Sequence, residues 1–288
     1  MILKGRYAIV TGGSIGLGAQ IATEFVRQGA SVLICARSAE ALEENAEKLC
    51  AIAGADQTVA AMVCDVTREG DIDGLVARAL KTFPHIDALV NNAGTYGPMG
   101  PIESVDWDDW KSALFTNLFG TIYFCRALIP HFRARGYGKI VNLSGGGATS
   151  PLPRITAYAA SKVAVVRMTE TLAEEVRGAG IDINAIAPGV LDTRLTDQLL
   201  EAGPDAVGAD LYTRVQKMAG EGGDAMERSA RLCAYLCSAQ SDGISGRLIA
   251  ALWDPWPDLA RHKTEIMDSD IYTLRRIVPK DRGKDWGD

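Results

Sequence analysis

Tyr158 and Lys162 are the residues of this 288-residue chain whose types and spacing best suit catalysis. Residues four apart on a helix lie on one face, one turn apart, so a phenol and an ammonium would be neighbours here. A free phenol has a pKa of about 10, and a nearby positive charge favours its phenolate form. The pair therefore predicts a general acid and base that moves a proton to or from an alcohol oxygen.

A third group is expected beside them, a hydroxyl that donates a hydrogen bond to the substrate oxygen. The segment NLSGGGATSPLPRITAYAASK, residues 142–162, precedes and includes the pair. The candidates in this segment are Ser144, Ser150 and Thr149, and the alternative is that no hydroxyl serves. A donor of this kind is typically worth about 10² to 10³ in rate, so its absence would weaken catalysis without abolishing it.

The elements that must position these side chains alternate along the chain. Short β-branched runs such as RYAIVTG, SVLICAR and GKIVNLSG are separated by helix-like segments. Helices are expected over residues 16–28, 39–53, 69–82, 107–134 and 157–178. The alternation indicates βαβ units, and strands that are apolar on both faces fit a parallel sheet covered by helices on both sides. We predict an α/β fold, a three-layer doubly wound parallel sheet of the Rossmann type.

Residues 1–250 are expected to form one domain, because no repeat, linker or low-complexity segment interrupts them. Residues 251–288 change character, with prolines, tryptophans and mixed charge, and are predicted to be a C-terminal extension. Its Trp253 and Trp256 would pack on the core or at an interface, or alternatively border the active site.

Composition narrows the function classes. The net charge of −6 gives no support for a nucleic-acid partner. The sequence contains no run of about 18 apolar residues, so we expect no membrane span. The six cysteines are scattered without a CxxC pair and the three histidines stand apart, so we expect no metal site. The N-terminus lacks the apolar core of a signal peptide, and buried thiols favour a cytoplasmic protein.

The segment TGGSIGLG, residues 11–18, follows the first strand and opens the first helix. Its glycines would let the backbone approach a pyrophosphate at a helix N-terminus. The spacing is G-x-x-x-G-x-G rather than G-x-G-x-x-G, and the alternative is a glycine-rich turn without a ligand. The loop predicts cofactor contacts from Gly12, Ser14, Ile15, Gly16 and Gly18.

The ends of the second and third strands bear on the choice of cofactor. Ala36 stands where many NAD-binding proteins carry an acidic residue for the ribose 2′-hydroxyl, and Arg37 follows it. A guanidinium without that carboxylate suits a 2′-phosphate, which favours NADP(H), with NAD(H) as the alternative. Asp65 ends the third strand, where it would accept an adenine amino hydrogen or cap the following helix.

Taken in order, these segments resemble those of the short-chain dehydrogenase/reductase family, over about residues 4–250. The glycine-rich loop is similar to that family's T-G-x-x-x-G-x-G, and Asp65-Val66 to its adenine contact. NNAG (91–94), the Asn117 of FTNLFGT, the Y-x-x-x-K of Tyr158 and Lys162, and APGVLDT (187–193) complete the pattern. The resemblance implies further cofactor contacts from Val66, Asn92, Ala93, Gly94, Tyr158, Lys162, Pro188, Gly189, Val190 and Thr193.

The resemblance implies an oxidoreductase that interconverts a secondary alcohol and a ketone. The Arg37 argument favours NADP(H) as its cofactor, and we favour Ser144 as the hydroxyl donor. Tyr158 would be the acid and base, Lys162 its modulator and ribose ligand, and Asn117 the holder of a water in a proton relay. One position departs from the pattern, since the family's serine thirteen residues before the tyrosine is Gly145 here, and Ser144 is fourteen residues before it.

The resemblance also bears on the surroundings of the site. It implies a mobile lid over about residues 193–219, for which a static surface hairpin is the alternative. It implies a homodimer or homotetramer built through the helices that follow the fourth and fifth strands. A small-molecule alcohol or ketone is the expected partner, and the alternative functions are an NAD-dependent dehydrogenase and a nucleotide-sensing protein with little turnover.

Overall fold

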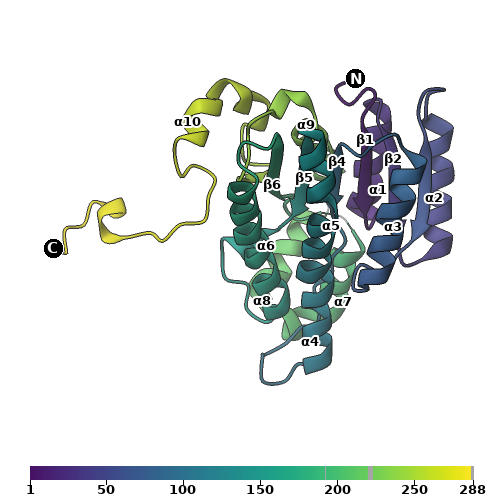
Figure 1. The fold of residues 1–288 in the computed structure, drawn as a ribbon. Helices are drawn as coiled ribbons and strands as arrows, with labels where there is room; N and C mark the ends of the chain where they lie inside the picture. The colour runs from purple at the N-terminus through teal and green to yellow at the C-terminus, as the bar shows by residue number, and fades with distance from the viewer. Residues whose placement is uncertain (192, 220–222, 287–288) are drawn as a thin grey trace.

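A seven-stranded sheet forms the centre of the chain in a computed structural model that describes residues 1–191, 193–219 and 223–286 (Figure 1). The strand order is β3-β2-β1-β4-β5-β6-β7, and every neighbouring pair is parallel. The strands are β1 (Tyr7–Thr11), β2 (Ser31–Ala36), β3 (Val59–Val63), β4 (Ala88–Asn91), β5 (Gly138–Leu143), β6 (Ile181–Ala187) and β7 (Leu248–Ala250). The predicted doubly wound Rossmann-type sheet is confirmed. Residue 192 of the predicted APGVLDT segment, residues 220–222 and the last two residues of the extension lie outside the described residues.

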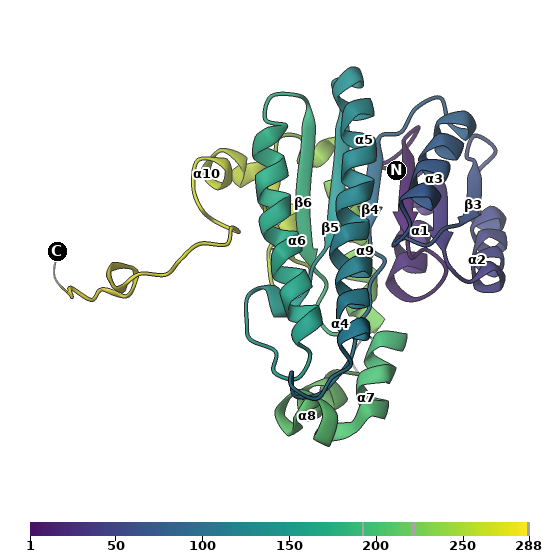
Figure 2. The same cartoon turned by 60° about the horizontal axis from the view of Figure 1, so that its bottom comes forward.

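Helices cover both faces of this sheet, as Figure 2 shows. Helices α1 (Gly16–Arg27), α2 (Ala39–Ile52) and α9 (Gly223–Leu236) share one apolar core with the sheet. Helices α3 (Glu69–Thr82), α5 (Gly120–Arg135) and α6 (Thr156–Glu175) share a second core on the other face. Successive β1 residues divide between them, because Ala8 and Val10 face the first core and Ile9 the second.

The helical run before β5 was predicted as one helix over 107–134, and the structure divides it. Helix α4 (Trp107–Leu114) begins where the Asp106 carboxylate accepts hydrogen bonds from two backbone N–H groups, both at 2.9 Å. A π-helical turn, Phe115–Phe119, then joins it to α5. By length and composition this run would pass for a membrane span. Its Phe124, Leu128 and Phe132 are instead fully buried against the sheet, so it is a core helix.

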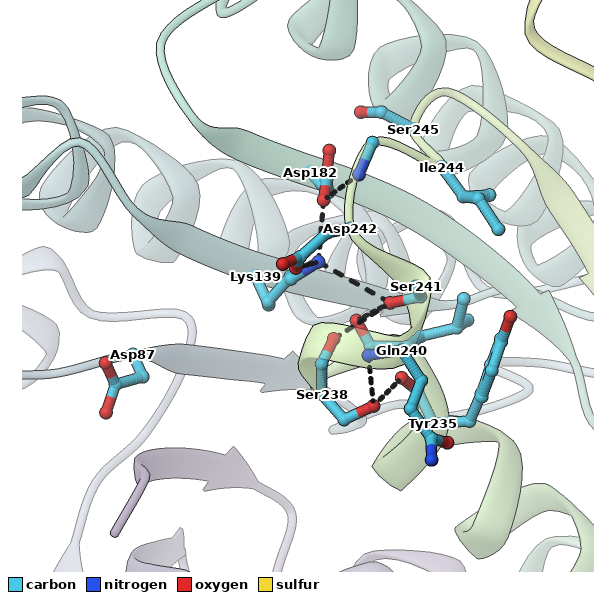
Figure 3. Close-up of polar contacts among 12 residues, drawn as sticks. Asp87, Lys139, Asp182, Tyr235, Ser238, Gln240, Ser241, Asp242, Ile244 and Ser245 are labelled. Atoms are coloured by element: carbon cyan, nitrogen blue, oxygen red, sulfur yellow. Dashed lines mark hydrogen bonds and ion pairs between the residues drawn. The ribbon is translucent and has the colours of Figure 1, made fainter. Parts of the chain in front are cut away.

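A buried cation ties the amino ends of β5 and β6 together (Figure 3). Lys139 is 1% exposed, and its Nζ lies 2.6 Å from Asp182 of β6 and 2.7 Å from Asp242. Ser241, on the same turn as Asp242, lies 3.5 Å from the ammonium. This network lies at the opposite end of the strands from the glycine-rich loop, so it supports the fold rather than the candidate site.

The C-terminal extension follows β7 and packs on the body only in its first part, within the described residues. Leu259 and Ile266, from the short helices η4 (Trp256–His262) and α10 (Lys263–Met267), are buried in the core that contains α9. The Leu274 N–H donates to Glu170 of α6 at 2.6 Å. Beyond this point the chain leaves the body, as both views show (Figures 1 and 2).

Candidate active site

A cavity of about 440 Å³ opens at the carboxyl ends of the strands, where the strand order reverses between β1 and β4. Ligands of doubly wound sheets bind at this position because the loops diverge there. The glycine-rich loop, the ends of β2 to β6 and helix α7 (Arg194–Val207) all contribute to its walls. A dinucleotide-sized site therefore lies where the fold alone would place one.

The glycine-rich loop fits closely around the start of α1. A Cβ on Gly18 would lie 2.0 Å from the Gly12 carbonyl oxygen, and one on Gly12 would lie 2.9 Å from Asn92 Nδ2. Gly12 and Gly16 both have positive φ, which glycine adopts without strain. Ile15, at the N-cap of α1, makes no side-chain capping bond. Among the described residues no side chain caps the first N–H groups of α1, which suits the oxygens of a phosphate.

The Asn92 side chain holds this loop to β4. Its Nδ2 donates to the carbonyls of Thr11 and Gly12, at 2.9 and 3.2 Å, and its backbone N–H donates to Thr11 Oγ1. Ala93 N–H donates to the same hydroxyl at 3.0 Å. Asn92 and Ala93, the second and third residues of NNAG, therefore hold the glycine-rich loop against the end of β4 at the cavity wall.

Arg37 and Asp65 lie at the other end of the cavity. Arg37 is exposed just beyond β2, and Ala36 beside it leaves no carboxylate at that strand end. Asp65 accepts hydrogen bonds from Thr67 N–H and Oγ1 at 2.9 and 2.8 Å. Burial opposes its charge, but these bonds and the charges of Arg37 and Arg68 leave the pKa of Asp65 lowered. Asp65 closes the turn before α3 rather than capping that helix, whose N-cap is Arg68.

Tyr158 and Lys162 project from the first turns of α6 into the cavity. Lys162 Nζ lies 5.5 Å from the centre of the Tyr158 ring and donates to the Leu143 carbonyl at 2.7 Å. Lys162 is 5% exposed, and burial lowers its pKa to about 8. Burial and the neighbouring Tyr96 raise the pKa of Tyr158 above its ordinary value. In the protein alone Tyr158 is thus a neutral phenol, suited to donate a proton.

Asn117 lies on the π-helical turn behind these residues. Its Oδ1 accepts from Thr95 N–H, and its Nδ2 donates to the Thr95 carbonyl, both at 2.8 Å. The same Nδ2 donates to Ser161 Oγ of α6 at 2.9 Å. A π turn shifts the side chains of a helix around its axis and is frequent at functional sites. Here it directs Asn117 toward the loop after β4, so Asn117 positions that loop; its predicted role in a water relay stays a prediction.

The three candidate hydroxyls after β5, those of Ser144, Thr149 and Ser150, are not directed toward Tyr158. Ser144 is 3% exposed, and its Oγ donates to the Lys162 carbonyl at 3.2 Å. To serve as the predicted oxyanion donor, it would have to exchange this bond for one to the substrate. Thr149 and Ser150 are exposed, and neither lines the cavity. Gly145 faces Tyr158, because a Cβ there would lie 2.3 Å from the Tyr158 hydroxyl oxygen.

All but two of the predicted catalytic and cofactor-binding residues line the cavity, and the exceptions are Val190 and Asn117. Val190 packs against the cluster of Leu199, Val207 and Val215, and Asn117 lies behind the wall. The predicted residues on the wall are Gly12, Ser14, Ile15, Gly16, Gly18, Arg37, Asp65, Val66, Asn92, Ala93, Gly94, Ser144, Tyr158, Lys162, Pro188, Gly189 and Thr193.

The segment after Thr193 covers one side of this cavity. Helices α7 and α8 (Ala209–Ala219) pack on each other, and α7 is kinked where Gly203 takes a positive φ before Pro204. Thr196 and Gln198 of α7 line the cavity. This placement suits the predicted lid, whose motion stays a prediction.

Sequence reasoning missed Tyr96, which follows NNAG by two residues. Its ring centre lies 4.7 Å from that of Tyr158, and it lines the same cavity. Its place directly after a recognised segment at a strand end was the available signal. Two of the three tryptophans of the extension differ in environment, because Trp256 packs on Tyr235 whereas Trp253 is 65% exposed near Gly189.

The fold and this cavity define a doubly wound α/β protein whose cavity at the strand ends suits a dinucleotide. Residues 6–203 match the family model described as short chain dehydrogenase. The chain therefore belongs to the short-chain dehydrogenase family, whose members are NAD(P)-dependent enzymes that act on CH–OH groups.

Relatives and solved structures agree with this assignment. The chain is 37% identical over 198 residues to 2-(R)-hydroxypropyl-CoM dehydrogenase of Xanthobacter autotrophicus, covering 68% of this chain and 78% of that protein. It is 37% identical over 245 residues to 3beta-hydroxysteroid dehydrogenase 1 of Eggerthella lenta, covering 85% and 91%.

Two solved structures are similar over the same region. Levodione reductase superposes with a TM-score of 0.77 at 26% identity, covering 86% of this chain and 96% of that one. A 3-ketoacyl-(acyl-carrier-protein) reductase from Brucella melitensis complexed with NADH superposes with a TM-score of 0.74 at 29% identity, covering 86% and 97%. The protein is thus an alcohol/ketone oxidoreductase with a nicotinamide cofactor and a small-molecule substrate.

Proposed function

We propose that this protein interconverts a secondary alcohol and a ketone with NADP(H), and that Tyr158 is its general acid and base. The observation that carries the proposal is the position of the Tyr158 phenol and the Lys162 ammonium in one cavity with the glycine-rich loop. When bound, the nicotinamide supplies the hydride that adds to the carbonyl carbon, or accepts one from the alcohol carbon. Tyr158 gives its proton to the carbonyl oxygen, or removes the hydroxyl proton in reverse.

The residues around the cavity fit such a cofactor. The N-terminus of α1, approached by Gly12 and Gly16, would hold the pyrophosphate. Lys162 would hold the nicotinamide ribose, for which its buried Nζ already lies beside Gly94, 3.6 Å from the Cβ that this glycine lacks. Arg37 supports NADP(H) over NAD(H), because an exposed guanidinium suits a 2′-phosphate and no carboxylate occupies the end of β2.

The substrate class is proposed from the relatives. The hydroxysteroid dehydrogenase and levodione reductase are named for carbocyclic substrates, whereas other relatives, L-fucose dehydrogenase and D-threitol dehydrogenase, are named for a sugar and a polyol. A panel of L-fucose, D-threitol, levodione and a 3β-hydroxysteroid samples these sizes and polarities. Each is assayed with NADP(H) and with NAD(H), in the direction that its oxidation state allows.

The test of the proposal is Tyr158→Phe. This variant keeps the ring and removes the proton that the mechanism moves, so turnover of the best panel substrate should fall by at least about 10²-fold. NADPH titration by fluorescence should be unchanged. Full turnover by Tyr158→Phe would refute the role of Tyr158, and tighter binding of NADH than NADPH by the parent protein would refute the proposed cofactor preference.

A homodimer or homotetramer through α4, the π turn and α6 is proposed as well. This face exposes four large apolar side chains within the described residues, Trp107, Phe115, Phe119 and Val163, at 58%, 45%, 37% and 40%. An exposed apolar patch of this kind is typical of an interface. Light scattering on the purified protein tests it, and a monomer at micromolar concentration would exclude it.

A further inference from the structure

A second hydroxyl donor would strengthen catalysis at this site, but the loop after β5 does not direct one toward Tyr158. Position 145, which faces the Tyr158 hydroxyl, is a glycine. Ser144, the residue before it, donates its proton to the Lys162 carbonyl. Thr149 and Ser150 are exposed outside the cavity. A donor to the substrate oxygen would therefore come from a different element.

Tyr96 lies on the loop after β4, on the cavity side of Tyr158. The two ring centres are 4.7 Å apart and the ring planes are inclined by 59°. The backbone of Thr95, directly before Tyr96, is held on both sides by the Asn117 amide, with two hydrogen bonds of 2.8 Å. Tyr96 also packs against the Leu199 cluster of the α7 and α8 segment. Its position is thus fixed by a buried amide on one side and by apolar packing on the other.

The hydroxyls of Tyr96 and Tyr158 have no hydrogen-bond partner within the described residues. Neither is among the fully buried polar atoms that lack one, so each retains surface in the cavity. Burial raises the pKa of Tyr96, which therefore keeps its proton at physiological pH. Two neutral phenols beside one cavity offer two O–H donors to one oxygen.

We propose that Tyr96 donates the second hydrogen bond to the substrate oxygen, the part that a serine hydroxyl would otherwise have. The inference rests on the proposed function, since it names a further catalytic residue for the same reaction. In the reductive direction, negative charge develops on the carbonyl oxygen as the hydride adds to carbon. Tyr158 transfers its proton to that oxygen, whereas Tyr96 keeps its own and donates a hydrogen bond that strengthens with the charge.

The test compares Tyr96→Phe with Ser144→Ala on the best substrate of the panel. Tyr96→Phe keeps the ring packing and removes only the hydroxyl, so kcat should fall by about 10²-fold while KM changes by less than about threefold. Ser144→Ala should lower kcat by less than Tyr96→Phe does, because the Ser144 hydroxyl is bonded to the Lys162 carbonyl. Both variants should bind NADPH as the parent does and should melt within a few degrees of it.

Four results would count against the inference. A Tyr96→Phe variant with the parent kcat would overturn it, as would a variant that raises KM alone, because Tyr96 would then only pack against the substrate. A large loss of kcat in Ser144→Ala with none in Tyr96→Phe would assign the donor to Ser144. Absence of turnover by the parent on the whole panel would instead be a failure of the proposed function, and the inference would fall with it.

Discussion

The hydroxyl oxygen of Tyr158 lies against the α-carbon of Gly145, so closely that a methyl group on that carbon would approach it to 2.3 Å. The same methyl group would lie 3.2 Å from the carbon that bears the hydroxyl. The φ of Gly145 is 177°, an extended value open to any residue. Glycine is therefore required here by the room that Tyr158 takes, not by the conformation of the backbone.

Gly145→Ala should displace the Tyr158 phenol and lower its activity. A shift of about 1 Å in a reacting group costs on the order of 10²-fold in rate. We expect a loss of about this size in kcat on the best panel substrate, with NADPH binding retained. Gly146→Ala is the matched control, since a Cβ there meets nothing within 4 Å and the position is exposed. A Gly145→Ala variant as active as Gly146→Ala would show that the phenol has another place to lie.

The two buried lysines should respond in opposite ways to replacement by methionine. Lys162 has no carboxylate partner within the described residues, and its pKa of about 8 lies below the unfolded value. Its charge therefore opposes folding fully below about pH 8, and this effect fades as the pH rises toward about 10.5. At pH 7 the lowered pKa of Lys162 corresponds to a loss of about 3 kcal/mol in the free energy of unfolding. Replacement by methionine recovers this loss but removes the hydrogen bond to Leu143, which is worth about 1 kcal/mol. Lys162→Met should raise the melting temperature at pH 7 and lose this advantage near pH 10.

Lys139→Met is the control for this comparison. Lys139 is paired with Asp182, at the amino end of β6, and with Asp242, on the turn that contains Ser241, so its removal leaves two carboxylates without their cation. Deleting one partner of a fully buried pair costs about 3 to 5 kcal/mol, and because the Asp242 side chain is 53% exposed the loss in Lys139→Met should be smaller than this. Calorimetry of both variants without cofactor measures the difference. Equal destabilisation by the two replacements would mean that the Lys162 site stabilises its charge.

The order of the elements was predictable because apolar runs and helix-like segments alternate with little ambiguity. The glycine-rich loop, NNAG and the tyrosine and lysine pair each follow a strand, and parallel strands bring their carboxyl ends to one edge of the sheet. Sequence position alone therefore brought Gly12, Asn92 and Tyr158 to one cavity.

The direction of individual side chains was beyond sequence pattern. Nothing in the run from Phe115 to Phe119 signals that the helix takes a π turn there, yet this turn directs Asn117 toward Thr95. Whether Ser144 faced Tyr158 or the Lys162 carbonyl depended on how β5 meets α6, a contact between segments 18 residues apart. Tyr96 belongs to no recognised pattern, and only the packing of the loop after β4 against α6 brings its ring to Tyr158.

Arg37→Leu should separate the two nicotinamide cofactors. A charge-assisted hydrogen bond contributes about 1.5 to 3 kcal/mol, so we expect NADPH binding to weaken by about 10- to 100-fold. NADH binding should change by less than about twofold, because NADH has no 2′-phosphate. Arg68→Leu is the matched control, since Arg68 also lies near Asp65 but does not line the cavity. Fluorescence titration measures all four affinities, and parallel losses for both cofactors would assign Arg37 a general electrostatic role.

Truncations within the C-terminal extension should affect stability differently, depending on whether residues 251–274 are kept. Removal of residues 275–288 takes away a segment in which Arg275 forms ion pairs with Asp270 and Asp281, and these exposed pairs contribute little to stability. The melting temperature should change by less than about 2 °C.

Removal of residues 251–288 exposes the core beneath Leu259 and Ile266, each worth about 1.5 to 3 kcal/mol of burial. It also strips the buried Arg247 guanidinium of the Ile266 and Ser269 carbonyls that accept its hydrogen bonds. The longer truncation should therefore unfold at least 10 °C below the parent or fail to fold. A well-folded protein ending at residue 250 would show that the first part of the extension is not a component of the core.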